Sequence, residues 1–70
     1  MITVAELIAE LQRLDPTMIA IVQKDGEGNA YSPLAGVDVG FYTAQNTWSG
    51  DVSEDEVPDG TSCIILFPVN

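Results

Sequence analysis

The stretch Ser62-Cys63-Ile64-Ile65-Leu66-Phe67, which ends at Pro68, is the most strand-like part of this chain. Five consecutive apolar residues without alternation are typical of a strand that is covered on both faces. We therefore predict a buried strand over residues 61–67. The single cysteine, Cys63, cannot form an internal disulfide, and its apolar neighbours indicate a buried, unreactive thiol.

Two further strands are expected on the N-terminal side of this stretch. One covers residues 17–23, of which 18–22 are apolar on both faces, and the other covers residues 37–43, which alternate between apolar and polar positions. Residues 44–60 are polar and acidic, with Trp48 as their only aromatic residue, and we expect them to form a long acidic loop.

The N-terminus predicts a helix over residues 3–14. Thr3 and Glu6 have the spacing of a capping box, in which each side chain accepts a hydrogen bond from the other residue's backbone N–H. Apolar residues then recur at helical spacing, at Val4, Leu7, Ile8, Leu11 and Leu14. Asp15-Pro16 ends the pattern, because a residue before proline is disfavoured in the α region.

These elements predict a single α+β domain over residues 1–70, with the N-terminal helix packed on a small antiparallel sheet of three to four strands. One short helix covers only one face of such a sheet. The other face is then covered by the loop 44–60, with Trp48 as a lid, or by a second chain. Because a domain of 70 residues buries little surface, we expect a homo-oligomer, most simply a dimer.

The charge balance excludes several classes of function. The chain has 11 acidic residues, two basic residues (Arg13 and Lys24) and no histidine, for a net charge of −9. It therefore cannot build a Ser-His-Asp triad or a His-ligated metal site, and it lacks the clustered cations that bind nucleic acid directly. We expect no enzyme, no cofactor and no metal site. Without a recognisable secretory leader or an apolar stretch of membrane-spanning length, a soluble intracellular protein is expected.

The acidic residues of the C-terminal half are concentrated in one segment. The candidate partner-binding residues are Asp51, Glu54, Asp55, Glu56 and Asp59, together with Trp48. An acidic surface beside an exposed aromatic anchor favours a partner protein with a basic surface. A solvated loop that keeps the protein soluble, a weak cation site and a carboxylate pair for acid–base catalysis are the alternative interpretations.

Four stretches together resemble a group of small acidic proteins of tailed bacteriophages and prophages. The stretches are residues 3–16, with Thr3-Val4-Ala5-Glu6-Leu7-Ile8 and Leu14-Asp15-Pro16; Gly28-Asn29-Ala30-Tyr31-Ser32-Pro33-Leu34; Thr47-Trp48-Ser49-Gly50-Asp51-Val52; and Leu66-Phe67-Pro68-Val69-Asn70. No reaction or residue role comes with this resemblance. It implies a phage accessory protein that acts in the host bacterial cytoplasm, and small accessory proteins of phages are often inhibitors of host defence.

Three functions follow as hypotheses. The first is a non-enzymatic accessory protein that binds and inhibits, or sequesters, a host component through the acidic segment. The alternative is an oligomeric sponge for a small signalling nucleotide, and a virion or morphogenesis component is the third. The ligand pocket expected for the sponge consists of Tyr31, Tyr42, Trp48, Arg13 and Lys24.

Overall fold

The N-terminal helix is present as α1 (Val4–Gln12) in the computed structural model, which describes residues 2–23 and 31–69. The predicted capping box is confirmed: Thr3 Oγ1 accepts a hydrogen bond from the Glu6 backbone N–H (3.2 Å), and Glu6 Oε1 accepts one from the Thr3 backbone N–H (3.1 Å). After the C-cap at Arg13, Asp15 Oδ1 accepts from the backbone N–H of Thr17 (2.9 Å), which turns the chain towards the sheet.

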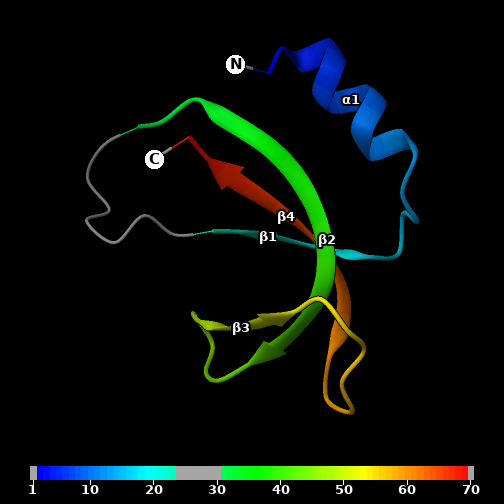
Figure 1. The fold of residues 1–70 in the computed structure, drawn as a ribbon, viewed down its shortest axis with the longest axis vertical. Coiled ribbons are helices and arrows are strands. Elements are labelled where there is room, and N and C mark those ends of the chain that lie inside the picture. Colours follow the sequence, from blue (N-terminus) through cyan, green and yellow to red (C-terminus); the bar gives the residue numbers. More distant parts are fainter. Residues whose placement is uncertain (1, 24–30, 70) are drawn as a thin grey trace.

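The sheet has four strands in the order β1-β4-β2-β3 (Figure 1). They are β1 (Ile19–Val22), β2 (Leu34–Ala44), β3 (Gly50–Ser53) and β4 (Thr61–Pro68). The strand predicted at 61–67 is thus the inner strand β4, between β1 and β2. The α+β class is confirmed, with one helix and one four-stranded sheet.

The prediction of a purely antiparallel sheet is wrong, because β1 runs parallel to β4. The β2–β4 and β2–β3 pairs are antiparallel. Parallel neighbours need a long connection between them. Here the hairpin of β2 and β3 lies in that connection, so β1 and β4 meet as parallel neighbours although 38 residues separate Val22 from Thr61.

The prediction of a loop over residues 44–60 is also wrong in its first half. The strand β2 continues to Ala44, the chain turns over residues 45–49, and β3 pairs back on β2 from Ala44–Gly50 to Phe41–Ser53. Only residues 54–60 connect β3 to β4 without strand structure. The backbone hydrogen bonds between β2 and β3 do not require apolar side chains. The hairpin can therefore form although Val52 is the only apolar side chain of β3.

Very few side chains are buried. Cys63 is fully buried and Ile64 nearly so, and among the described residues only Gly40, on the neighbouring strand, is buried with them. The predicted burial of Cys63 is confirmed, and burial raises the pKa of its thiol. The core therefore consists of the middle of β4 and of the part of β2 that lies beside it.

Helix α1 lies beside the curved sheet, and none of its side chains is buried. Leu7 and Leu14 are half-buried, whereas Val4, Ile8 and Leu11 on the same apolar stripe are exposed. The molecule measures 34 × 31 × 18 Å. In the part of the chain that the structure describes, no helix is long and apolar enough to cross a membrane.

Candidate binding surface

The turn between β2 and β3 holds Trp48 in a defined position. The backbone N–H groups of Gln45 and Asn46 both donate to the carbonyl oxygen of Ser49, at 3.0 and 3.1 Å. The side-chain oxygen of Asn46 in turn accepts hydrogen bonds from the Trp48 backbone N–H (3.0 Å) and from Ser49 Oγ (3.0 Å). Four hydrogen bonds within five residues therefore fix the turn that carries the only tryptophan of the chain.

Tyr42 packs against the backbone at the start of β3. A Cβ added to Gly50 would lie 2.6 Å from Tyr42 Cζ, so this position must be a glycine for the ring to lie where it does. The close approach places the Tyr42 ring next to the turn of Trp48. The two aromatic residues thus come from the strand β2 and from the turn of the same hairpin.

An open hollow of about 650 Å³ lies between this hairpin and the edge strand β1. Tyr42, Trp48 and Val52 line it on the hairpin side, and Ile21 and Ile65 line it on the side of β1 and β4. The strand residues among them share one face of the sheet. Tyr42 lies opposite Val52. Asp38, on the same face of β2 as Tyr42, lies opposite Ile65, and Ile65 lies opposite Ile21. The lining is mainly apolar, and no charged side chain contributes to it.

The interpretation of Trp48 as a lid over the sheet is wrong. Its side chain borders the hollow but remains 73% exposed, so it closes nothing. An indole exposed to this extent on a hydrogen-bonded turn is accessible to another molecule. The hydrogen bonds between the two ends of the turn explain why the side chain points outward. They reverse the chain within five residues, so that Trp48 lies at the tip.

The residues expected to form a small-molecule pocket come together only in part. Tyr42 and Trp48 line the same hollow, whereas Tyr31 is fully exposed and does not line it. The exposed guanidinium of Arg13 lies 4.0 Å from Glu10 at the end of α1, and Lys24 lies outside the described residues. Val52 and Ile21 are pocket residues that sequence reasoning missed. The polar neighbours on either side of Val52 were the available signal for a strand.

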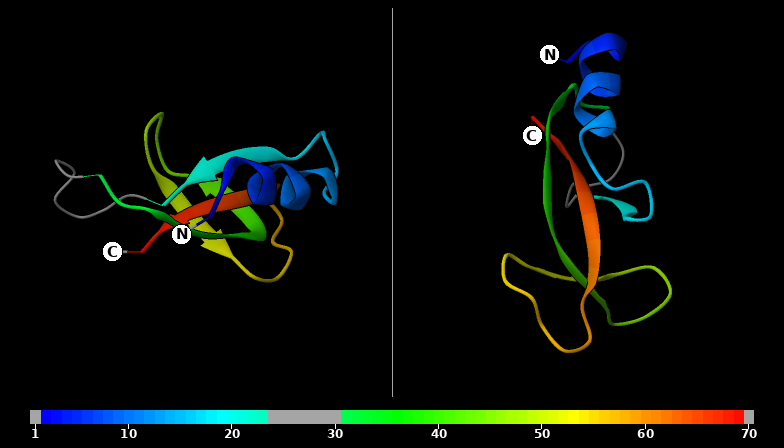
Figure 2. Two further views of the ribbon diagram at one scale, coloured as in Figure 1. Left: turned by 90° about the horizontal axis from the view of Figure 1, so that it is seen from above. Right: turned by 90° about the vertical axis from the view of Figure 1, so that its right-hand side faces the viewer.

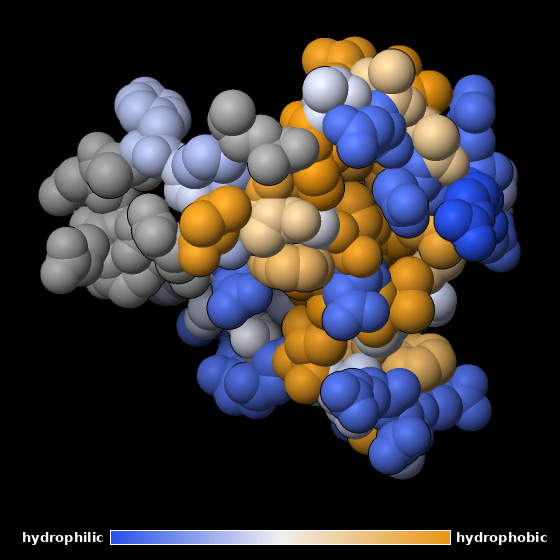
Figure 3. Space-filling model, turned by 45° about the horizontal axis from the view of Figure 1, so that its top comes forward, coloured by the Kyte–Doolittle hydropathy of each residue, from blue (hydrophilic) through white to orange (hydrophobic). Residues whose placement is uncertain are grey.

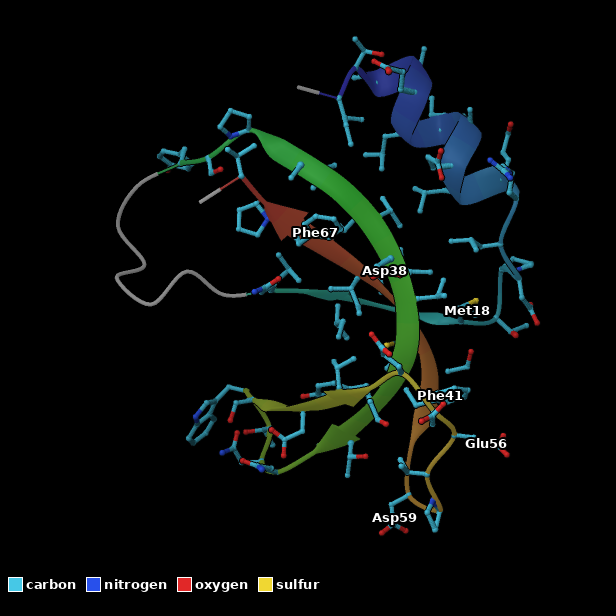
Figure 4. All side chains as sticks on the ribbon, in the orientation of Figure 1. Met18, Asp38, Phe41, Glu56, Asp59 and Phe67 are labelled. Atoms are coloured by element: carbon cyan, nitrogen blue, oxygen red, sulfur yellow. The ribbon has the colours of Figure 1, made fainter. Side chains whose placement is uncertain are left out.

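The acidic residues divide between a strand and a connection. Asp51 lies in β3, where Gln45 Nε2 donates a hydrogen bond to it, and it shares a second, shallower hollow of about 330 Å³ with Asp59. Glu54, Asp55 and Glu56 belong to the connection from β3 to β4 and do not line that hollow. All five carboxylates are exposed, and Figure 4 shows Glu56 and Asp59 pointing away from the sheet.

No group of three or more His, Cys, Asp or Glu side chains is close enough to hold a metal ion among residues 2–23 and 31–69. The carboxylates whose pKa is lowered, Glu6 and Asp15, owe this to hydrogen bonds from Thr3 and Thr17 at the two ends of α1. Both lie outside the acidic segment 51–59, so their role is to cap the chain turns.

No protein-family model, curated protein or solved structure matches this chain.

Proposed function

We propose that this chain is a non-enzymatic accessory protein of a tailed phage that binds a basic surface on a host protein and inhibits or sequesters it. The observation that carries the proposal is Trp48, an exposed indole held at the tip of a hydrogen-bonded turn, next to an apolar hollow. Tryptophan is the residue type most enriched among the side chains that dominate binding energies. A fixed anchor also loses little conformational entropy when it binds.

The acidic segment 51–59 supplies the second part of the proposed mechanism. Its carboxylates begin three residues after Trp48 and are exposed. In the described part of the chain, the one ion pair is that of Arg13 with Glu10 on α1, so the segment has no cation of its own among these residues. Exposed charge of one sign accelerates encounter with a surface of opposite sign by about 10-fold to 1,000-fold at low ionic strength. The segment would therefore steer a basic partner, and Trp48 would then hold it.

Binding is favoured over catalysis by the chemistry of the side chains. The chain contains no histidine, and its one thiol is buried with a raised pKa, which makes it a poor nucleophile. The resemblance to phage proteins supports the proposed setting in the host cytoplasm.

The test compares two double variants with equal charge changes. Glu54→Gln/Glu56→Gln removes two of the five carboxylates of the acidic segment, and Glu10→Gln/Asp38→Asn removes two exposed carboxylates elsewhere. Tagged protein first captures a partner from bacterial host lysate, and association rates are then measured with the purified partner at low and high salt. We expect the first variant to associate about tenfold more slowly at low salt. The control should change the rate much less, and equal effects of the two variants would contradict a specific role of the segment.

A small-molecule sponge is the second candidate, and one observation favours it. Tyr42 and Trp48 line the same hollow, whose volume of about 650 Å³ lies in the range of small-molecule pockets. Native mass spectrometry of protein purified from infected cells distinguishes the two functions. A retained small molecule that is lost in Trp48→Ala supports the sponge, and a retained host protein supports the inhibitor.

A further inference from the structure

The strand β1 is an open edge of the sheet. It pairs only with β4 among the described elements, and the Gln23 backbone N–H donates to the Leu66 carbonyl oxygen at 2.9 Å. Backbone groups of successive strand residues point to opposite sides. Because Gln23 points towards β4, so does Ile21, and the N–H and C=O groups of Ala20 and Val22 point away from the sheet. These two residues offer donors and acceptors to another strand.

Apart from its short length of four residues, β1 has none of the features that usually protect an edge strand. Edge strands of monomeric proteins usually carry a lysine, a proline, a bulge or an inward-pointing charge that prevents pairing with another chain. The four residues of β1 are Ile19, Ala20, Ile21 and Val22, and they pair with β4 without a register shift. The side chain of Val22 is 68% exposed. An apolar, regular edge of this kind is suited to strand pairing.

Helix α1 leaves a second apolar surface uncovered on the same side of the molecule. The right-hand view of Figure 2 shows α1 and β1 on the same side of β2 and β4. Val4, Ile8 and Leu11 lie at i, i+4 and i+7 on one helix face and are exposed. In Figure 3 the hydrophobic surface runs from α1, at the upper right, down onto the strands. Glu6 and Glu10 lie on the other side of the helix at 100° per residue.

The total exposed area of this chain is larger than that of an average folded monomer of the same mass. A folded monomer of 7.5 kDa is expected to expose about 4,250 Å². This chain exposes 5532 Å², which is an excess of about 1,300 Å². A standard stable interface buries about 800 Å² on each partner. The excess exposed area of the whole chain is thus larger than the share of one partner in a standard interface.

We infer that the occupant of this surface is a second copy of the chain, with the two β1 strands paired antiparallel about a twofold axis. Ile21 would face its own copy at the axis, and Ala20 of each chain would pair with Val22 of the other, since these residues carry the outward groups. The two sheets then form one eight-stranded sheet. The exposed face of α1 adds apolar contact area on the same side.

Two considerations select a second copy over a different protein. A core with so few buried side chains cannot offset the entropy of ordering the chain, so the covering partner must be present whenever the protein folds. A second copy meets that condition, because it is present wherever the chain itself is made. The charge is compatible with this choice, because the connection that carries Glu56 and Asp59 lies at the opposite end of the molecule from α1 (Figures 1 and 4). The inference does not depend on the proposed function.

The first test is the state of association in solution. Sedimentation of the wild-type chain at micromolar concentration should give twice the mass of one 7.5 kDa chain. Val22→Lys places a charge on the edge and should raise the dimer dissociation constant at least tenfold. Val69→Lys adds the same charge at a similarly exposed valine (59%) beyond the end of β4 and should leave the dimer intact. A monomeric wild type, or equal dimerisation of the two variants, would overturn the inference.

The second test uses only the wild-type chain and so remains decisive if Val22→Lys does not fold. Amide hydrogen exchange is measured residue by residue along β1. In the dimer, the outward amides of Ala20 and Val22 should exchange as slowly as that of Gln23, which is bonded to Leu66 within the chain. Rapid exchange at Ala20 and Val22 beside a protected Gln23 would show a free edge and refute the strand pairing.

Discussion

Gly40 of β2 lies directly opposite Cys63 of β4, and these two residues form the most buried part of the sheet. A Cβ added to Gly40 would lie 2.9 Å from Cγ1 of Val52 and 3.0 Å from the carbonyl oxygen of Ser53. The absence of a side chain at Gly40 therefore lets β3 approach β2 closely. Four predictions about stability and chemistry follow from this arrangement and from the exposed surface around it.

The substitution Gly40→Ala should destabilise the protein by about 1–3 kcal/mol, because the new methyl group meets both a side chain and the backbone of β3. Urea unfolding followed by far-ultraviolet circular dichroism measures this, at one fixed chain concentration. Ala44→Ser, at the exposed end of the same strand, is the control and should stay within about 0.5 kcal/mol. A neutral Gly40→Ala would mean that β3 is not held against β2 as described.

The thiol of Cys63 should be unreactive in the folded protein. Burial raises the pKa of this thiol, so a smaller fraction of it is ionised at a given pH than of a free cysteine, and the thiolate is the reactive form. A disulfide reagent that reports thiol release should label it slowly in buffer and at once in denaturant. Equal labelling rates in the two conditions would show that β4 is not the inner strand.

The carboxylate of Glu6 should stabilise the protein in a pH-dependent way. Hydrogen bonds from Thr3 lower the pKa of Glu6, so its contribution is present above the unfolded-state pKa and is lost as the pH falls through the lower folded-state pKa. The difference in unfolding free energy between wild type and Glu6→Gln should thus be largest near neutral pH and shrink in acid. Glu10→Gln, which removes a helix carboxylate that caps no backbone N–H group, is the matched control.

The substitution Trp48→Ala should leave stability nearly unchanged. Because the indole is mostly exposed, the free energy of unfolding should change by less than about 0.5 kcal/mol. A tryptophan that covered the core would cost about 3–5 kcal/mol on the same change. Ile64→Ala, at a buried residue, is the positive control with an expected loss of about 2–5 kcal/mol. A large loss for Trp48→Ala would restore the lid interpretation.

Local sequence signals predicted the elements that depend on local chemistry. The capping box of Thr3 and Glu6 identified the start of α1, since both partners lie within one turn of the chain. The unbroken apolar run around Ile64 identified β4 as a strand with little exposed surface, and Cys63 as buried. The strands at 17–23 and 37–43 were found as well, with ends that differ by up to three residues from β1 and β2.

The strand β3 was missed because its four residues include one apolar side chain, Val52. Its pairing with β2 depends on backbone hydrogen bonds and on the turn around Asn46. The composition of this segment does not distinguish a paired strand from a polar loop. The candidate surface was therefore only half predicted. Trp48 and Tyr42 were named, but the hollow they share with Ile21 and Ile65 requires strands that are distant in the sequence.

The sequence by itself determined that this protein has one capped helix, an apolar inner strand and a strongly acidic C-terminal half. Each of these follows from the side chains of neighbouring residues. Only the tertiary structure decided that β1 runs parallel to β4 and ends as an apolar edge, and that Trp48 stands exposed beside a hollow. The physical reason is that strand direction and edge position are set by pairing between residues far apart in the chain, which no local pattern specifies.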